Sequence, residues 1–490
     1  MLQKLHERRA PARRAADLRE RASRPGPSLS FRRQCPFERS PDMTWPEETA
    51  LLTDLYQLTM TEAYLEEGMW DEAVFSLFAR KLPPRRNYLL AAGLDDALRY
   101  LEKLRFGTEA LDWLASRGRF SDRLLGWLER FRFSGDVDAV AEGTPVFAEE
   151  PLLEVRAPLP EAQLVETYLL NQVHFQTTVA SKAARVVTAA AGRHVMDFGL
   201  RRYHGTDAGL KVARAAYVAG VDSTSNVLAG KTYGIPLAGT MAHSYVQSHD
   251  DELEAFRAFV RVHPNATLLV DTYDTLRGVQ HVIRLARELG EDFQVRSIRL
   301  DSGDLLALSK AAREMLDEAG LEQVRVYASG GLDEDAVAKL VARGAPIDSF
   351  GVGTAMGVSS DAPAVDMAYK LVAYAGRPRV KLSSGKLLLP GAKQIYRREV
   401  DGVARGDVLT CRQDTAPGRP LLQPVMRGGQ RLPEASPTLE AIREFARSEL
   451  SRLPPEIRAL SPAKPPYPVA LGQALLRARE HEVELWSAAT

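Results

Sequence analysis

The chain has 490 residues, of which 45% are hydrophobic and 26% charged, as in an ordinary globular protein with room for two or three domains. No apolar run approaches the ~20 residues that a membrane span needs, so we expect no membrane partner. The two cysteines, Cys35 and Cys411, have no metal-ligand spacing and favour neither a disulfide framework nor a zinc site, which makes a reducing cytoplasm the expected location.

The formal net charge of zero conceals a basic N-terminal segment. Residues 1–42 contain eleven Lys/Arg and five Asp/Glu, so the rest of the chain is acidic overall. A protein that bound nucleic acid through its body would more often be basic, and we expect no nucleic-acid partner. We predict that residues 1–45 form a disordered tail, with a targeting or anion-binding arm as the alternative.

Residues 46–160 are predicted to form a mixed α+β domain. Asp54 is a plausible N-cap for an amphipathic helix, and residues 73–78 alternate as a strand does. Residues 82–87 form a loop, and residues 133–158 are rich in strand-forming residues and turns.

Residues 161–366 change to an alternation of strands and helices. A long helical stretch over 161–192 is followed by short apolar runs, with helical segments such as 276–289 and 305–319 between them. The runs expected to be strands are 195–198, 237–240, 267–271, 295–301, 324–329 and 347–353. Apolar strands separated by helices favour a parallel sheet covered by helices. We predict an α/β fold with an irregular (β/α) barrel that need not be complete; a doubly wound sheet is the second choice.

Residues 367–490 return to β-like segments, over 369–374, 379–382 and 394–397. Their turn residues suggest that this part of the chain partly rejoins the first domain. A C-terminal helix is expected over about 471–486.

Two neighbouring predicted strands end in glycine turns, Ser329-Gly330-Gly331 and Gly351-Val352-Gly353-Thr354. Glycine lets backbone N–H groups approach a phosphate, and a helix that begins just after the turn adds its dipole. A parallel barrel keeps its reactive groups at the C-terminal ends of its strands, often with a phosphate site late in the strand order. We therefore predict a phosphate site at these turns, although two tight turns without a ligand would share the pattern.

The other strand ends carry side chains suited to binding or catalysis. Asp301 could accept the hydroxyls of a ribose or help to hold a metal, and Arg299 lies on the same face of its strand, where an Arg–Asp pair is the structural alternative. Phe198 could stack on a planar ligand and Arg201 could clamp a carboxylate. His243 could be a base, a nucleophile or a metal ligand, although a lone histidine is usually structural.

Two further segments are less specific. The basic, glycine-turned hairpin that contains Lys381, Ser383 and Lys393 could grip a polyphosphate, but alone it would be read as a solvated edge hairpin. The motif Asp271-Thr272-Tyr273-Asp274 also ends an apolar run, and the residues alone suggest no task for it.

Taken in order, these motifs resemble the nicotinate phosphoribosyltransferase family. The resemblance runs from Leu52 to about Arg397 and leaves out the basic tail and the far C-terminus. It is carried by Leu52 to Met60, Asp197-Phe198-Gly199-x-Arg201-Arg202, Ser223-Thr224-Ser225-Asn226, Gly239-Thr240-x-Ala242-His243-Ser244, Asp271-Thr272-Tyr273, Leu300-Asp301-Ser302-Gly303-Asp304, Gly351-x-Gly353-Thr354 and Pro390-Gly391-x-Lys393-Gln394. Gly331 departs from the pattern, because relatives more often have a polar residue there.

The resemblance implies a barrel like that of type II phosphoribosyltransferases, in a homodimer with shared active sites. It implies transfer of phosphoribosyl from phosphoribosyl pyrophosphate to nicotinate, giving nicotinate mononucleotide and pyrophosphate, coupled to hydrolysis of ATP with Mg²⁺ as in a ligase. His243 would be transiently phosphorylated, and Tyr56 of the partner subunit and Phe198 would sandwich the pyridine ring. The catalytic residues implied are His243, Asp301 and Arg299; those for substrate are Tyr56, Phe198, Arg201, Thr224, Ser225, Gly330, Gly331, Gly353 and Thr354; those for ATP or pyrophosphate are Arg85, Lys381, Ser383 and Lys393.

Three alternatives stay open at this point. A relative that prefers nicotinamide would share these motifs, since Arg201 cannot by itself exclude an amide. A catalytically silent barrel that only binds nucleotides would be expected to lose His243, Asp301 or the glycine turns, and this chain keeps all of them. A quinolinate-type transferase needs no phosphorylatable histidine and usually has a shorter chain.

Overall fold

A computed structural model describes residues 47–382 and 388–488 of the chain. The predicted tail over residues 1–45 and the predicted ligand Ser383 lie outside the described residues. Among the described helices, none is long and apolar enough to cross a membrane.

The first domain is built on an antiparallel sheet of seven strands within the described ranges. In sheet order these are β13 (Arg377–Pro378), β12 (Met367–Tyr374), β1 (Glu72–Ala79), β5 (Pro151–Pro158), β3 (Asp136–Ala139), β17 (Gln423–Arg427) and β18 (Gln430–Arg431). The 310 helix η1 (Glu47–Leu51), the helices α1 (Leu55–Glu67), α2 (Leu94–Lys103), α3 (Thr108–Ser116), α4 (Asp122–Arg130) and α5 (Leu159–Leu164), and the short pair β2 (Leu89–Leu90) and β4 (Pro145–Val146) complete it. The predicted strand over 73–78 is confirmed as β1.

Strands of the C-terminal part join the sheet of the first domain. β12 lies antiparallel beside β1, with Leu77 opposite Tyr369. A separate sheet contains β16 (Arg419–Pro420), β14 (Lys393–Val400), β15 (Val403–Cys411) and β19 (Val469–Leu471), and its apolar face shares a core with the first domain. The remaining elements are the 310 helix η4 (Pro433–Ala435) and the helices α15 (Leu439–Arg452), α16 (Pro455–Arg458) and α17 (Gln473–Ala488). The predicted strand over 379–382 is wrong, because the short strand here is β13.

The central part of the described chain forms the predicted parallel sheet. In sheet order its strands are β7 (Ser223–Thr224), β6 (His194–Asp197), β11 (Ser349–Val352), β10 (Arg325–Ala328), β9 (Ser297–Leu300) and β8 (Thr267–Leu269), and every neighbouring pair is parallel. The helices between them are α7 (Thr206–Val218), α8 (Val227–Tyr233), α9 (His243–Gln247), α10 (Glu252–Val262), α11 (Thr275–Leu289), α12 (Leu305–Glu318), α13 (Glu334–Ala342) and α14 (Thr354–Gly357), with the 310 helices η2 (Leu200–Arg202) and η3 (Gly290–Asp292). The irregular (β/α) barrel is confirmed, and it is incomplete between β7 and β8.

The predicted strand over 237–240 is the reason for the gap. Leu237 makes a single parallel bridge to Thr224 of β7, and no ladder links this segment to β8 among the described residues. Leu237 is 56% exposed, so the apolar run that looked like a buried strand does not pack into the sheet. The structure instead supplies β7, which the sequence analysis did not predict.

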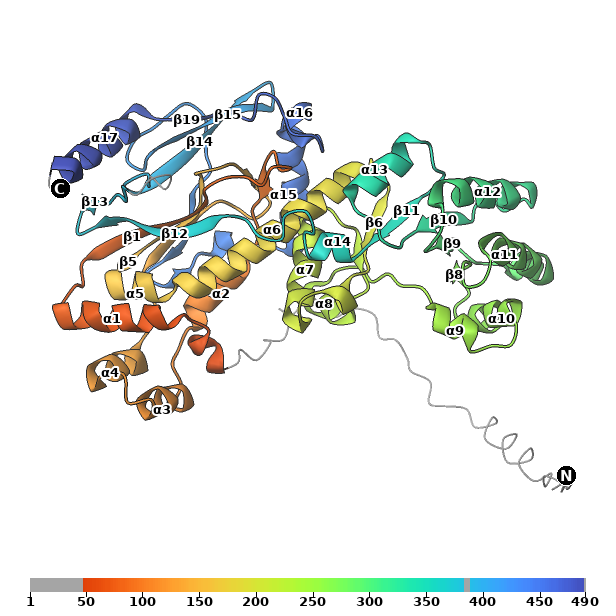
Figure 1. The fold of residues 1–490 in the computed structure, drawn as a ribbon, viewed down its shortest axis with the longest axis horizontal. Helices are drawn as coiled ribbons and strands as arrows, with labels where there is room; N and C mark the ends of the chain where they lie inside the picture. The colour runs from red at the N-terminus through yellow and green to blue at the C-terminus, as the bar shows by residue number, and fades with distance from the viewer. Residues whose placement is uncertain (1–46, 383–387, 489–490) are drawn as a thin grey trace, which may run out of the picture. The chain divides into compact units, whose positions relative to one another are not determined.

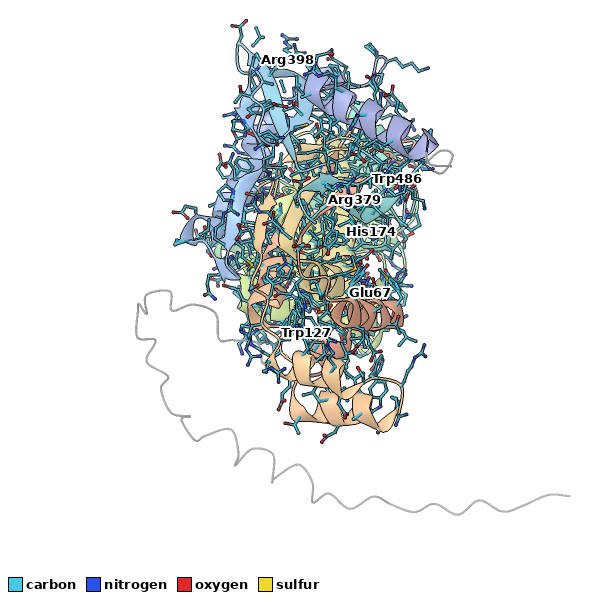
Figure 2. All side chains as sticks on the ribbon, turned by 90° about the vertical axis from the view of Figure 1, so that its left-hand side faces the viewer. Glu67, Trp127, His174, Arg379, Arg398 and Trp486 are labelled. Atoms are coloured by element: carbon cyan, nitrogen blue, oxygen red, sulfur yellow. The ribbon has the colours of Figure 1, made fainter. Side chains whose placement is uncertain are left out.

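The long helix α6 (Glu166–Ala190) joins the two cores (Figure 1). Its N-terminal half, with Tyr168 and Val173, packs into the core of the first domain. Its C-terminal half, with Ala180 and Ala183, packs into the barrel core. His174, labelled in Figure 2, lies between the two halves and accepts a hydrogen bond from the Val365 N–H at 2.9 Å. Helix α6 therefore contributes side chains to both cores in one continuous element.

The first turn of helix α1 differs from the prediction, because the predicted N-cap residue does not cap it. Asp54 occupies the predicted N-cap position with extended backbone, but its carboxylate does not cap the helix. It accepts a hydrogen bond from Thr167 of α6 at 2.8 Å instead. Asp54 thus fixes α1 against α6 rather than satisfying the first helical N–H groups.

Candidate active site

The predicted functional residues follow the C-terminal ends of the parallel strands. Phe198 follows β6, Ser225 follows β7, Asp271 lies just beyond β8, Asp301 follows β9 and Ser329 follows β10. Because neighbouring parallel strands end at the same edge of a sheet, these residues come together although they are far apart in the chain.

Arg299 is the centre of a hydrogen-bond network at this edge. Its guanidinium donates to Ser329 Oγ at 2.7 Å, to Thr240 Oγ1 at 2.8 Å and to Asp301 Oδ1 at 2.7 Å. It also lies 5.6 Å from the ring centroid of Phe198. The ion pair between Arg299 and Asp301, which the sequence allowed as a purely structural feature, is therefore present. It also orients the Asp301 carboxylate beside the Phe198 ring.

Asp301 is held as an ionised carboxylate. Burial by itself would raise its pKa, but hydrogen bonds from Ser329 and Arg299 and the charge of Arg299 outweigh burial and lower the pKa below its ordinary value. Oδ1 is occupied by Arg299 and Ser329, while Oδ2 lies 3.7 Å from His243 Nε2. One oxygen is thus tied to the scaffold, and the other faces His243.

His243 begins the short helix α9 and keeps 39% of its side chain exposed. Its Nδ1 is 3.2 Å from Thr272 Oγ1, and its Nε2 faces Asp301. Asp271 accepts hydrogen bonds from the Asp301 backbone N–H at 3.0 Å and from Ser302 Oγ at 2.6 Å. The motif that contains Asp271 and Thr272, to which the sequence alone gave no role, therefore supports both His243 and Asp301. The only sequence signal for this role was its position at a strand end, like the other site motifs.

The two glycine turns lie beside this network. Gly330 has φ +89°, and a Cβ atom there would be 1.9 Å from the carbonyl oxygen of Asp301. A Cβ atom at Gly353 would be 3.1 Å from Gly199 Cα, in the turn that follows Phe198. Helix α13 begins soon after Gly331, and the Asp333 carboxylate caps it by accepting from the Ala336 N–H at 2.8 Å. On one side, both turns pack closely against neighbouring strand ends. On the other side, their backbone is accessible to a ligand.

Phe198 lies on the inner side of the barrel end. Its ring meets that of Tyr327 edge-on, with centroids 5.6 Å apart. A cavity of about 670 Å³ inside the barrel is lined by Phe198, Tyr327 and Thr240 toward the strand ends, and by Arg296 and Arg325 toward the strand starts. This volume falls in the range of small-molecule sites and is ample for a single aromatic ring.

The predicted substrate residues of β7 and η2 have different surroundings. The Thr224 hydroxyl donates to the buried Asp197 carboxylate at 2.8 Å, so it ties β7 to β6. Ser225 is half-buried and its backbone N–H donates to the Asp197 carbonyl at 2.9 Å. Arg201 is exposed on η2 and makes no hydrogen bond or ion pair with other described residues. Its charge is therefore available to a ligand.

Tyr56 is not brought to this site within one chain. It is 46% exposed on α1 and lines a shallow hollow of the first domain with Glu166 and His174. Partial burial, followed by the nearby charges of Glu166 and Asp54, raises the pKa of its phenol to about 12. Its contacts are with α1 and α6, and none is with the strand ends of the described barrel.

The predicted polyphosphate residues are only partly assembled. Arg85 donates to Asp335 in the first turn of α13 at 2.6 Å, which places it near the glycine turn of Gly330. Lys381 is exposed. Lys393 is 2% exposed; it donates to the Gly391 carbonyl at 2.8 Å and lies 3.4 Å from Glu154, and burial lowers its pKa. The structure thus places Lys393 in the interior of the antiparallel sheets rather than in the strand-end network.

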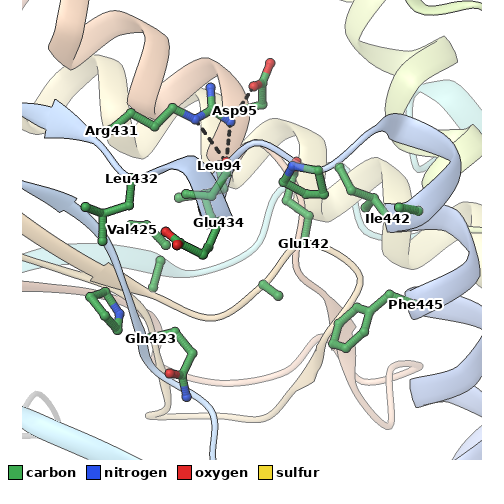
Figure 3. Close-up of a pocket in the computed structure, with 16 residues that line it drawn as sticks. Leu94, Asp95, Glu142, Gln423, Val425, Arg431, Leu432, Glu434, Ile442 and Phe445 are labelled. Atoms are coloured by element: carbon green, nitrogen blue, oxygen red, sulfur yellow. Dashed lines mark hydrogen bonds and ion pairs between the residues drawn. The ribbon is translucent and has the colours of Figure 1, made fainter.

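A second cavity, of about 500 Å³, lies in the first domain beside α15 (Figure 3). Apolar side chains such as Val425, Ile442 and Phe445 form much of its wall. Two of its three carboxylates, Asp95 and Glu142, are already paired with Arg431 and Arg214 respectively, and the third is Glu434 on the exposed 310 helix η4. The cavity therefore lacks the cluster of chemical groups found at the barrel ends.

No three His, Cys, Asp or Glu side chains converge as a metal site anywhere in the two described ranges. Asp301 Oδ1 and Asp271 Oδ2 are engaged by Arg299, Ser329, Ser302 and the Asp301 backbone N–H. Asp271 Oδ1, by contrast, is buried without a hydrogen-bond partner among the described residues.

Comparison with known proteins decides the family. Residues 51–174 match the nicotinate phosphoribosyltransferase (NAPRTase) N-terminal domain, residues 193–384 the NAPRTase family and residues 415–479 the NAPRTase C-terminal domain. The chain belongs to the nicotinate phosphoribosyltransferase family. The C-terminal match extends beyond the segment in which the motifs were recognised from the sequence.

Individual relatives agree with this membership. Nicotinate phosphoribosyltransferase pncB2 of Mycobacterium tuberculosis is 56% identical over 427 residues, covering 87% of this chain and 92% of that protein. Nicotinate phosphoribosyltransferase of Bacillus subtilis is 44% identical over 359 residues, covering 72% of this chain and 73% of that protein. The crystal structure of human nicotinic acid phosphoribosyltransferase superposes with a TM-score of 0.79 at 32% identity, covering 88% of this chain and 99% of that one.

Proposed function

We propose that this chain transfers the phosphoribosyl group of phosphoribosyl pyrophosphate to the ring nitrogen of nicotinate, and that hydrolysis of ATP through a phosphohistidine at His243 is coupled to the transfer. Family membership supports the transfer. The observation that carries the proposal is the continuous network of Thr240, Arg299, Ser329 and Asp301, with His243 beside it and the two glycine turns at the same strand ends.

The chemistry of the transfer fits these groups. Breaking the bond between ribose and pyrophosphate builds positive charge on the sugar, and the pyridine nitrogen already carries a lone pair, so no strong general base is needed. The site must instead align the ring, hold the ribose and neutralise the leaving group. In the proposal Phe198 stacks on the ring, Arg299 and Arg201 are the cations for its carboxylate, and the ionised Asp301 accepts the ribose hydroxyls.

The glycine turns are the proposed site of the 5′-phosphate. Gly330 and Gly331 both have positive φ, and Gly353 precedes the short helix α14 that begins at Thr354. Backbone N–H groups in such turns can approach a phosphate closely because no Cβ intervenes. Mg²⁺ would enter with ATP and with phosphoribosyl pyrophosphate as part of these substrates.

The coupling role of His243 rests on its accessibility and on its neighbours. Its ring is partly exposed, is held by Thr272 and lies beside the carboxylate that we assign to the ribose. Phosphorylation there would add about two negative charges next to Asp301 and the pyrophosphate position. Such a change would alter the affinity of the site for substrates and products, which is what energy coupling requires.

A homodimer with shared sites is part of the proposal. Phe198 offers one stacking face within the chain, while Tyr56 is exposed on the first domain of the same chain. A two-fold dimer would bring Tyr56 of the partner subunit to the barrel end of the first. We place the reaction in the cytoplasm, in keeping with the few cysteines.

One assay tests the proposal. Purified protein is given phosphoribosyl pyrophosphate and Mg²⁺ with either nicotinate or nicotinamide, with and without ATP, and the mononucleotide formed is measured by chromatography. We expect nicotinate mononucleotide, formed faster with ATP, and an Asp301→Asn variant as an inactive control. A preference for nicotinamide would replace the substrate we propose, and no product from either base would remove the enzymatic assignment.

A further inference from the structure

Each of the two glycine turns is followed by a buried or half-buried carboxylate. Glu334 lies in the first turn of α13, soon after Gly331, and it is fully buried. Asp361 lies shortly after α14, which begins just beyond Gly353. Both acids are ionised: burial opposes this, but their hydrogen bonds and ion pairs with cations outweigh burial and lower the pKa of each.

A single side chain binds both of these acids. The Lys182 ammonium donates to Asp361 Oδ1 at 2.8 Å and makes a very short hydrogen bond to Glu334 Oε2. Lys182 is 1% exposed and comes from the barrel half of α6. The segments that follow the two turns are thus joined to each other through one buried ammonium group.

The surrounding charges are not balanced. Arg185 of α6 also donates to Glu334, at 3.0 Å, and Arg86 donates to both oxygens of Asp361, at 2.7 and 3.0 Å. Three buried cations therefore face two acids. In addition, Arg185 Nη2 is buried without a hydrogen-bond partner among the described residues. An excess of buried positive charge behind a phosphate turn favours the binding of an anion in front of it.

We propose that Lys182 is a positioning residue for the 5′-phosphate of phosphoribosyl pyrophosphate, because it fixes the separation of the turns at Gly330 and Gly353 through Glu334 and Asp361. The inference rests on the proposed function for the identity of the phosphate ester. Lys182 itself touches no substrate in this account. Its loss would let the two turns move independently, so that backbone N–H groups from both could no longer meet one phosphate.

The test compares Lys182→Met with a matched control. Methionine keeps a side chain as long as the aliphatic stem of lysine and removes the ammonium. Lys211→Met is the control, because Lys211 is also a buried lysine paired with a carboxylate, Asp96 Oδ1 at 2.6 Å, but that acid follows neither glycine turn. Each variant is measured for thermal midpoint, for KM toward phosphoribosyl pyrophosphate and nicotinate, and for the Kd of ribose 5-phosphate by calorimetry.

We expect both variants to lower the thermal midpoint. Only Lys182→Met should raise the KM for phosphoribosyl pyrophosphate and the Kd of ribose 5-phosphate, by roughly tenfold or more, while the KM for nicotinate stays within about twofold. Equal changes in the two variants would reduce Lys182 to a structural residue and overturn the proposal. If Lys182→Met does not fold, Asp361→Ala removes the acceptor at the more exposed end of the link and should show the same selectivity.

The two proposals fail differently. If the wild-type protein forms no mononucleotide but binds ribose 5-phosphate, the proposed function falls while the calorimetry still tests Lys182. If the wild-type protein forms mononucleotide and Lys182→Met binds ribose 5-phosphate normally, only the role of Lys182 falls.

Discussion

Replacement of Gly330 by alanine should damage the site far more than replacement of its neighbour Gly331. Both glycines have positive φ, +89° and +64°, so alanine at either position costs about 1 kcal/mol of backbone strain. Their surroundings differ. A Cβ atom at position 330 would be 1.9 Å from the Asp301 carbonyl oxygen, whereas a Cβ atom at position 331 meets nothing within 4 Å.

The size of the effect follows from this contact. Real Cβ atoms essentially never approach another atom closer than 3.0 Å, so the turn at position 330 and the backbone that carries the Asp301 carboxylate must move apart by about 1.1 Å from the 1.9 Å separation. A misplacement of about 1 Å in a reacting group can cost about 100-fold in rate. That is about 2.7 kcal/mol of lost transition-state stabilisation. For Gly331→Ala no such displacement is needed.

The assay is kcat/KM for phosphoribosyl pyrophosphate at saturating nicotinate, with the thermal midpoint of each variant measured alongside. We expect Gly330→Ala to lose about 100-fold and Gly331→Ala to lose less than about tenfold. Equal losses in the two variants would refute the argument, since they share only the backbone strain. A Gly330→Ala variant with normal activity would show that Asp301 is not held by this turn.

Three further outcomes are expected. His243→Ala should retain some transfer but lose its stimulation by ATP, measured as the ratio of rates with and without ATP; an unchanged ratio would remove His243 from the coupling step. Mixing inactive Tyr56→Ala and Phe198→Ala proteins should restore activity, because a hybrid dimer contains one intact shared site; no recovery after verified subunit exchange would contradict sites shared between subunits. Burial raises the pKa of Glu149 to about 7, only partly offset by neighbouring cations, so its contribution to stability is present below about pH 4.5 and lost as pH rises through 7. Glu149→Gln should therefore raise the thermal midpoint at pH 8 and not at pH 4, whereas an equal change at both would contradict that assignment.

The sequence predicted the barrel well where periodicity and burial agree. The helices over 276–289 and 305–319 appear as α11 and α12, because their apolar spacing reports one buried face. The segment 237–240 has the same apolar start but remains at the open side of the barrel, where only Leu237 makes a bridge. An apolar run shows that a segment can be buried, and the neighbours it finds in the fold decide whether it becomes a strand.

The site could be predicted as a series of strand ends but not as a network. The sequence pointed to His243 and Asp301. It did not show the hydrogen bond that the Asp301 N–H donates to Asp271 or the one that His243 shares with Thr272, because both depend on how the strands pair in the sheet. For Lys393, by contrast, the sequence pattern predicted the wrong surroundings. Its position in a glycine-rich, basic hairpin suggested an exposed cation, whereas Glu154 and two backbone carbonyls hold it in the interior.

The final extent of reaction tests the central claim most directly. A catalyst alone cannot change an equilibrium, so transfer without coupling must stop at the same ratio of nicotinate mononucleotide and pyrophosphate to nicotinate and phosphoribosyl pyrophosphate whether or not ATP is present. The account predicts that wild-type protein with ATP and Mg²⁺ carries the reaction beyond that ratio, with ADP released, and that His243→Ala does not. The same final ratio with and without ATP in the wild-type protein would contradict it.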